Sequence, residues 1–234
     1  MALASVGADL NTSASNEYTW SPLAVACNAR DLDLVRFLLD HGAKWTSTCE
    51  WMEDHGPGRA NTILHQTAGE WPADHLVSIL ELGADELIDI CGNSAESPLG
   101  YHAAFDRVEH VKALLRFGAN PNVILPEQGA FAPLDSAIME LQVDIVEVLL
   151  GAGANPNVPT WMWVTATDRV VNPEVEPSDA TDRAKAQAIQ KMVITAAKHH
   201  PPPVYPDGTV PEHWPPEKGR HAKRIKPPTA RDPS

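Results

Sequence analysis

Residues 97–122 read S-P-L-G-Y-H-A-A-F-D-R-V-E-H-V-K-A-L-L-R-F-G-A-N-P-N, and this stretch decides the fold. A serine followed by proline begins a helix, because proline loses no hydrogen bond in the first helical turn. A turn at residues 105–107 leads to a second helix, and Gly118 ends that helix in the left-handed conformation. The apolar residues of the two helices lie on shared faces: Leu99, Ala103, Val108, Val111, Leu114 and Leu115. Such a pair buries only one of its sides, so it needs neighbours.

The same pattern recurs along the chain. The pair Gly-Ala begins at residues 7, 42, 83, 118 and 153, with steps of 35, 41, 35 and 35 residues. The leucine of the first helix recurs at residues 23, 64, 99 and 134, with steps of 41, 35 and 35 residues. Helix starts and helix ends therefore repeat in register, which indicates a stack of similar units.

The repeated words resemble the ankyrin repeat, with its T-P-L-H-x-A first helix and its G-A-D/N closure. The helix starts are S-P-L-A-V-A (21–26), T-I-L-H-Q-T-A (62–68), S-P-L-G-Y-H-A (97–103) and A-P-L-D-S-A (132–137). The closures are GADLN (7–11), GAKW (42–45), GADE (83–86), GANPN (118–122) and GANPN (153–157). The resemblance covers about residues 2–160 and implies an all-α ankyrin-repeat solenoid of helix-turn-helix repeats joined by hairpin loops.

This reading divides the chain into five parts. Residues 1–18 are a partial N-terminal repeat or a cap. Four repeats follow in residues 19–160, at about 19–60, 61–95, 96–130 and 131–160. Residues 161–200 form a degenerate fifth repeat or a C-terminal helical cap. Ten of the 34 residues from 201 to 234 are proline, so we expect this tail to be disordered.

Charge and composition restrict the classes of partner that the chain could bind and the compartment in which we expect it. The chain has a formal net charge of −13, of which the tail contributes +2 and residues 1–200 contribute −15. An acidic body repels nucleic-acid phosphates and favours a basic partner surface. No apolar run is long enough to cross a bilayer, and no secretory signal is visible. Three cysteines without zinc-like spacing, Cys27, Cys49 and Cys91, favour reduced thiols and an intracellular protein of the cytoplasm or nucleus.

The segment 44–61 departs from the pattern, because here the loop between repeats is six residues longer than its counterparts. One interpretation makes Trp45 and Trp51 anchors for a partner; the other folds both indoles back over the loop. A metal site of Cys49, His55 and an acid is a weaker alternative. A further alternative is an enzyme or a small-molecule binder that uses the enlarged loop.

No catalytic motif is present. The sequence lacks a P-loop, a dinucleotide fingerprint, a nucleophile elbow and H-E-x-x-H, so we predict a non-catalytic protein without cofactor or metal. The resemblance implies that His65 hydrogen-bonds loop backbone between repeats. His102 occupies a position that usually holds alanine, and we interpret it as a packing residue.

The resemblance also implies which residues face a partner. In ankyrin repeats the first helices and the loops line a concave surface, and here that surface would carry apolar and acidic side chains. A protein or peptide with apolar anchors and Lys/Arg fits such a surface, and we expect the chain itself to be a monomer. The candidate residues are Trp20, Asn28, Glu70, Glu96, Phe105, Phe131, Met139 and Glu140.

The tail offers an alternative function. Pro202-Pro203-Val204-Tyr205 matches the P-P-x-Y pattern that WW domains recognise as a preformed polyproline stretch. The chain would then be an adaptor that links cargo on the repeats to a WW-domain protein such as a ubiquitin ligase. Residues 223–226, K-R-I-K, are either a nuclear-import patch or a solvated linker.

Overall fold

The computed structural model describes residues 9–11, 20–48, 50–51, 60–66, 71–92, 96–123, 131–160, 164–173 and 177–204. Within these ranges the first helices of successive repeats are α1 (Pro22–Asn28), α3 (Ile63–Gln66), α5 (Pro98–Ala104), α7 (Pro133–Met139) and α9 (Ala166–Val171). The second helices are α2 (Leu32–Asp40), α4 (Ala73–Glu81), α6 (Val108–Arg116), α8 (Val143–Gly151) and α10 (Ala180–Ala197).

The first helices begin at side-chain caps. The hydroxyls of Ser21 and Ser97 accept the N–H of the third following residue, each at 3.2 Å, and proline opens both helices. In α7 an alanine stands at the cap, and the Asp135 carboxylate accepts its N–H at 3.3 Å instead. Helix α9 has a reciprocal box in which Thr165 and Asp168 cap each other's backbone.

The second helices end alike and differ in length. Gly42, Gly83, Gly118 and Gly153 follow α2, α4, α6 and α8 with φ between 90° and 101°, a region that suits glycine. These four helices have nine residues each, whereas α10 has 18 and is capped by Asp179. Helix α10 buries Ile189, Val193 and Ala197 at intervals of four residues.

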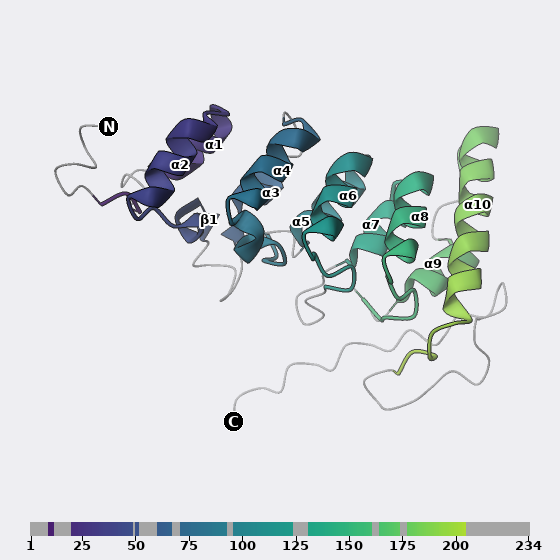
Figure 1. Ribbon diagram of the computed structural model, residues 1–234. Coiled ribbons are helices and arrows are strands. Elements are labelled where there is room, and N and C mark those ends of the chain that lie inside the picture. Colours follow the sequence, from purple (N-terminus) through teal and green to yellow (C-terminus); the bar gives the residue numbers. More distant parts are fainter. Residues whose placement is uncertain are drawn as a thin grey trace, which may run out of the picture.

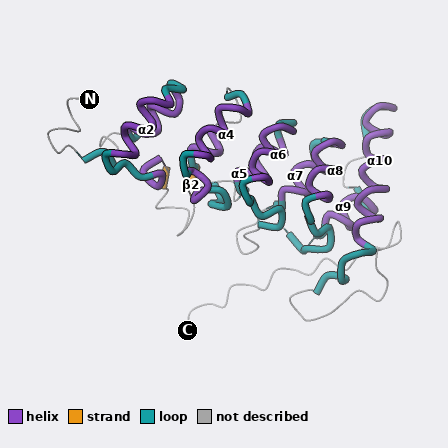
Figure 2. Tube along the Cα trace, in the orientation of Figure 1, coloured by secondary structure: helices purple, strands orange, loops and turns teal. Residues whose placement is uncertain are grey.

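The helices form two rows, which the ribbon and tube views show side by side (Figures 1 and 2). Helices α3, α5, α7 and α9 contact one another in succession and make the inner row, which α1 precedes. Helices α4, α6, α8 and α10 contact one another likewise and make the outer row, which α2 precedes. The prediction of an all-α solenoid is confirmed; the described residues also include one pair of two-residue strands, β1 (Glu50–Trp51) and β2 (Ala60–Asn61).

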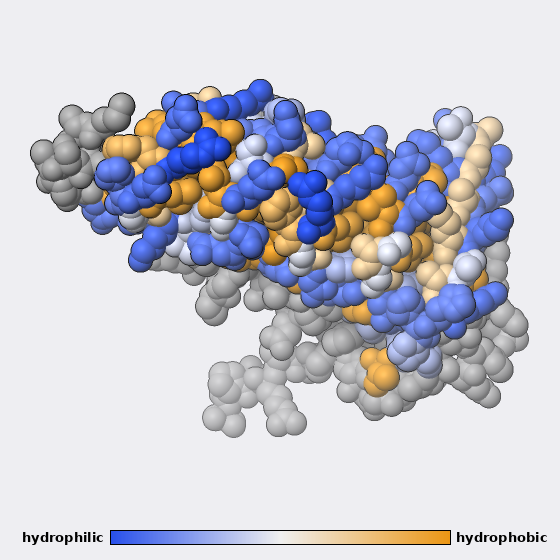
Figure 3. Space-filling view, in the orientation of Figure 1, coloured by the Kyte–Doolittle hydropathy of each residue, from blue (hydrophilic) through white to orange (hydrophobic). Residues whose placement is uncertain are grey.

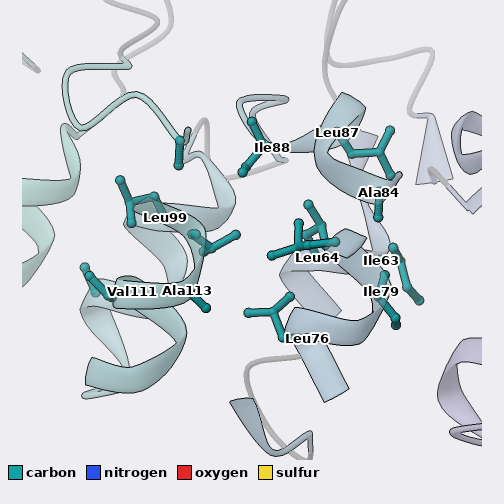
Figure 4. Packing of buried hydrophobic residues seen from close by; sticks show 14 of the residues in the cluster. Ile63, Leu64, Leu76, Ile79, Ala84, Leu87, Ile88, Leu99, Val111 and Ala113 are labelled. Carbon is teal, nitrogen blue, oxygen red and sulfur yellow. The ribbon is translucent and has the colours of Figure 1, made fainter. Parts of the chain in front are cut away.

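The core lies between the two rows and runs along the stack from Leu10 to Val193; Figure 4 shows the part of it between Ile63 and Ala113. It contains the recurring leucine of each first helix, Leu23, Leu64, Leu99 and Leu134, none more than 2% exposed. Each repeat adds its own layer, and stacking these layers removes apolar surface from water. Large side chains that are fully buried include Leu76, Ile79, Leu80, Leu87, Leu114, Ile145, Leu149 and Ile189.

Asparagines tie successive loops together. The Asn11 amide donates to the Gly42 carbonyl at 3.0 Å, and its oxygen accepts the Lys44 N–H at 2.8 Å. Asn122 repeats the pair one boundary before the end of the array, with Gly153 and Asn155 at 3.1 and 2.7 Å. Because each asparagine bridges to the next loop, the final asparagine of these closures holds the stacking register.

Trp45 lies inside the fold, which corrects the expectation that it anchors a partner. Its side chain belongs to a 3₁₀ turn (η2, Trp45–Thr48) and is only 5% exposed. The indole Nε1–H donates to the Leu82 carbonyl at 3.1 Å, 37 residues further along the chain. The physical reason is that this boundary between the first two repeats needs an apolar filler, and an indole with one satisfied N–H provides it.

None of the helices in the described ranges has the length and apolar composition needed to span a membrane.

Candidate partner-binding surface

Large exposed apolar side chains gather on one row of the solenoid. Among the described residues five such side chains are exposed, and four of them, Trp20, Val25, Phe105 and Met139, lie on or beside helices α1, α5 and α7. The fifth, Val204, follows α10. We call the surface formed by Trp20, Val25, Tyr101, Phe105, Met139 and Glu140 the inner face. Its composition is unusual for a solvent-exposed surface.

The centre of the inner face is an aromatic pair on α5. Tyr101 and Phe105 are four residues apart, and their ring centroids are separated by 4.8 Å with the planes tilted by 52°. Phe105 is 55% exposed, whereas Tyr101 is half-buried and also meets the His65 ring edge-on at 6.0 Å. One ring is therefore held by its neighbours and supports the other, which faces solvent.

Helix α7 continues this surface with an apolar and an acidic residue. Met139 is 52% exposed, and Glu140, which ends the helix, is exposed as well. They stand 35 residues after Ala104 and Phe105, so each occupies the same place in its repeat. Glu96 is engaged differently, because its Oε1 accepts a hydrogen bond from Ser136 Oγ at 2.8 Å and so links two repeats.

Phe131 is occupied within the protein. The guanidinium of Arg169 lies over its ring at 5.1 Å from the centroid, and Arg169 Nε donates to Asp135 Oδ1 at 2.8 Å. Asp135 is 1% exposed on its side chain and Arg169 is 12% exposed. This ion pair connects α7 to α9, so we assign Phe131 to the joint between these repeats rather than to the exposed part of the inner face.

The first repeat contributes a separate apolar group. Trp20 is 42% exposed and Val25 is 52% exposed, while Asn28 at the end of α1 is half-buried. The Asn28 side-chain nitrogen is buried without a hydrogen-bond partner in the described part of the chain. Of these residues, Val25 was absent from our candidates; its signal was that it occupies the same place in its repeat as Tyr101.

One of these repeats matches a known protein family. The chain matches the ankyrin-repeat family over residues 18–49, which contain α1, α2 and the 3₁₀ turn that follows them. The same caps, turns and glycine ends recur in the later repeats described above. This chain folds as an ankyrin-repeat solenoid. None of the curated proteins searched matches it.

Ankyrin repeats generally mediate protein–protein interactions and are generally non-catalytic. Among the described residues, no three His, Cys, Asp or Glu side chains gather where a metal ion could bind. Two candidate residues, Glu70 and Tyr205, lie outside the described ranges, as do Cys49 and His55. For Trp51 the structure gives the backbone alone, in β1 paired with Ala60.

The two histidines interpreted as structural do hold ankyrin repeats together. His65 Nδ1 accepts the Thr62 N–H at 3.2 Å, so its Nε2 carries the proton and donates to the Glu96 carbonyl at 3.1 Å. This confirms the expected bond between repeats. His102 is fully buried, and its Nε2–H donates to the Leu64 carbonyl at 3.1 Å.

A second surface feature lies in the outer row. An open groove of about 520 Å³ runs between α8 and α10, where Figure 3 shows a pale-orange strip along α10. Most of its lining is apolar: Val143, Leu150, Ala188, Met192 and Ala196, with Glu147, Lys191 and Thr195 beside them. The groove is far along the chain from segment 44–61, to which the small-molecule alternative assigned the site.

The start of the tail is held against the last repeat. The Asn157 amide donates to the Ala197, His200 and Pro201 carbonyls at 3.0, 3.3 and 2.9 Å. Beyond this contact Pro202 is exposed, Pro203 is buried and Val204 is 61% exposed. A WW domain grips consecutive prolines from outside, so Pro203 in this position is not available to one.

Proposed function

We propose that this ankyrin-repeat protein binds another protein through the inner face. The observation that carries the proposal is the concentration of exposed apolar side chains on α1, α5 and α7, with the Tyr101–Phe105 pair at its centre. Exposed apolar residues in a well-packed monomer mark interaction surfaces when they cluster. Aromatic residues that are held by a neighbour also bind at low entropic cost.

The partner in this proposal carries apolar anchors beside Lys or Arg. Asp106 and Glu140 are exposed next to Phe105 and Met139, and the chain as a whole has a net charge of −13. Acidic groups around an apolar centre favour cationic partners, raise the rate of encounter and exclude acidic competitors.

The test is selection of peptides from a random displayed library on the full chain. Phe105→Ser and Met139→Ser should each weaken the selected peptides at least tenfold, which is about 1.4 kcal/mol. Met192→Ser, in the groove between α8 and α10, is the matched control and should change affinity less than twofold. Peptides that tolerate both inner-face substitutions but lose affinity with Met192→Ser would move the binding site to the outer row and overturn the proposal.

We also propose an intracellular location. Cys27 is free and buried, and burial raises the pKa of its thiol to about 12. A thiol that stays protonated and shielded is a small apolar core residue and needs no disulfide partner. A fluorescent fusion of the full chain in its native cells would test the location, and secretion of the fusion would contradict it.

A further inference from the structure

The third repeat has two histidines in its interior. His102 on α5 is 0% exposed and His110 on α6 is 6% exposed. Their rings are stacked, with centroids 4.9 Å apart and planes only 16° from parallel. Two neutral imidazole rings can stack at this distance without electrostatic repulsion, but two imidazolium ions would repel each other strongly in a medium of low polarity.

Both rings also bridge to the repeat before them. His102 Nε2–H donates to the Leu64 carbonyl at 3.1 Å, and His110 Nε2–H donates to the Trp71 carbonyl at 2.8 Å. His75 makes the corresponding bond one boundary earlier, to the Cys27 carbonyl at 3.1 Å. A carbonyl only accepts, so each ring uses its single proton on Nε2 in the neutral form. These hydrogen bonds join the first three repeats.

The fourth repeat has apolar residues at the positions that correspond to these two histidines. Ala137 and Ile145 stand 35 residues after His102 and His110, and both are fully buried. The joint between the fourth and fifth repeats uses the Asp135–Arg169 ion pair instead. Among the described residues, the histidine side-chain bonds between repeats therefore lie in the N-terminal part of the solenoid, and the ion pair lies in the C-terminal part.

The surroundings oppose a second proton on these rings. Burial lowers the pKa of His102 to about 3, and His110, His65 and Arg107 add repulsion. Burial also lowers the pKa of His65 to about 4 and lowers the pKa of His110, which Arg107 lowers further and Glu109 raises. The other ionisable groups on elements packed against α5 and α6 are Asp74, His75 and Glu81 on α4, Lys112 and Arg116 on α6 itself, Asp135 on α7 with its partner Arg169, and Asp144 and Glu147 on α8.

We propose that the boundary between the second and third repeats is an acid-sensitive hinge, at which α5 and α6 open locally in mild acid while α7–α10 stay closed. Acid favours the open state of this boundary. The rings are neutral while buried and take up protons once exposed, so their stabilising effect is complete above pH 6.5 and is lost as pH falls toward 3–4. Exposure of His102 by opening therefore raises the opening constant about tenfold per pH unit below 6.5, until the pH approaches the pKa of the buried ring.

The hinge has a consequence that rests on the proposed function. His102 lies on the same helix as Tyr101 and the adjoining Phe105, so opening of α5 removes the centre of the inner face. Acid would then release a bound protein by displacing the contact residues on α5. The hinge can be tested without a partner, so a failure of the hinge and a failure of the binding proposal are separate results.

The first experiment is hydrogen exchange of the full chain at pH 7.5, 6.5 and 5.5, corrected for intrinsic exchange rates. Amides of α5 and α6 should lose at least tenfold protection between pH 7.5 and 5.5, the loss expected from His102, and more because the pKa of His110 is also lowered in the folded protein. Amides of α8 should lose less than threefold. Equal losses in α6 and α8 would mean that the protein opens as a whole in acid and would overturn the hinge.

The second experiment exchanges the pair for the residues of the fourth repeat. His102→Ala with His110→Ile should reduce the pH response of α5 and α6 at least tenfold, because no proton is then taken up at these positions. His199→Gln, at an exposed histidine after α10, is the matched control and should keep the full response. A double variant that keeps the full response contradicts the proposal. The single variant His110→Ile, which should also reduce the response, serves the same purpose if the double variant does not fold.

Discussion

Arg169 Nε donates to Asp135 Oδ1 at 2.8 Å, and neither side chain is more than 12% exposed. Asp135 also accepts the N–H of Ala132 at the start of its own helix, so one carboxylate caps α7 and binds α9. Arg169 in turn lies over Phe131. The last repeat is thus joined to the fourth by a charge pair that water does not solvate, and such a pair is costly to break from one side.

Arg169→Met should therefore lower the free energy of unfolding by about 3 kcal/mol, because it leaves the Asp135 carboxylate buried without its counter-charge. Urea denaturation measures the change. Adding Asp135→Asn should recover most of the loss, since an amide still accepts the Ala132 N–H and carries no charge. If the double variant is as unstable as the two single losses added together, the two residues do not act as a pair.

Trp45→Phe should lower the free energy of unfolding by about 1–2 kcal/mol, because the Leu82 carbonyl loses its donor and the smaller ring leaves space. Trp45→Ala should cost about 3–5 kcal/mol. Phe105→Ala is the contrasting control, since that ring is 55% exposed, and it should cost less than about 1 kcal/mol. A large loss for Phe105→Ala would show that this ring belongs to the core and not to a binding surface.

The repeating part of the fold could be predicted because each of its signals depends on residues that are close together in the sequence. Three residue types recur at fixed steps, and each has one local role. Proline begins the first helix (Pro98), leucine fills the core (Leu99), and glycine ends the second helix in the left-handed conformation (Gly118). The bonds that join repeats were not predictable in the same way. Arg169 stands 34 residues after Asp135, in a segment with a weak pattern. The sequence marks Asp135 as unusual for its position but does not identify its partner.

The candidate surface shows the same limit. Phe105 and Met139 were predicted from their place in the repeat, and both are exposed. Trp45 was left with two interpretations, because an aromatic residue in a long loop has two physical options, to face a partner or to fill a boundary. The choice depends on the space between α2 and α4, which residue spacing does not define. Phe131 was counted as exposed because its cation, Arg169, lies in another repeat.

The turn between the two helices of a repeat contains unfavourable backbone. Arg30, Asp106 and Leu141 have φ of 57°, 55° and 54°, which costs a residue with a side chain about 1 kcal/mol. Asp106→Gly should therefore raise the free energy of unfolding by up to about 1 kcal/mol, while Asp106→Ala should lower it. Thermal denaturation of both variants decides the matter, and equal effects of glycine and alanine would show that the turn is not strained.

The Asn157 side-chain amide donates to three carbonyls at and after the end of α10, whereas the amide of Asn122, its equivalent in the repeat before, donates only to Gly153. Asn157 is 2% exposed, and Thr167 Oγ1 donates to its oxygen at 3.0 Å while its amide reaches three carbonyls. Asn157→Asp removes those donors and places a negative charge at a helix C-terminus, so unfolding should become about 3 kcal/mol easier. Asn122→Asp, at the half-buried equivalent 35 residues earlier, loses one bond to Gly153 and should cost less than about 1 kcal/mol. Urea denaturation compares the two, and hydrogen exchange should show lost protection in the last turn of α10 for Asn157→Asp alone. Equal costs at the two positions would mean that the buried amide does not hold α10.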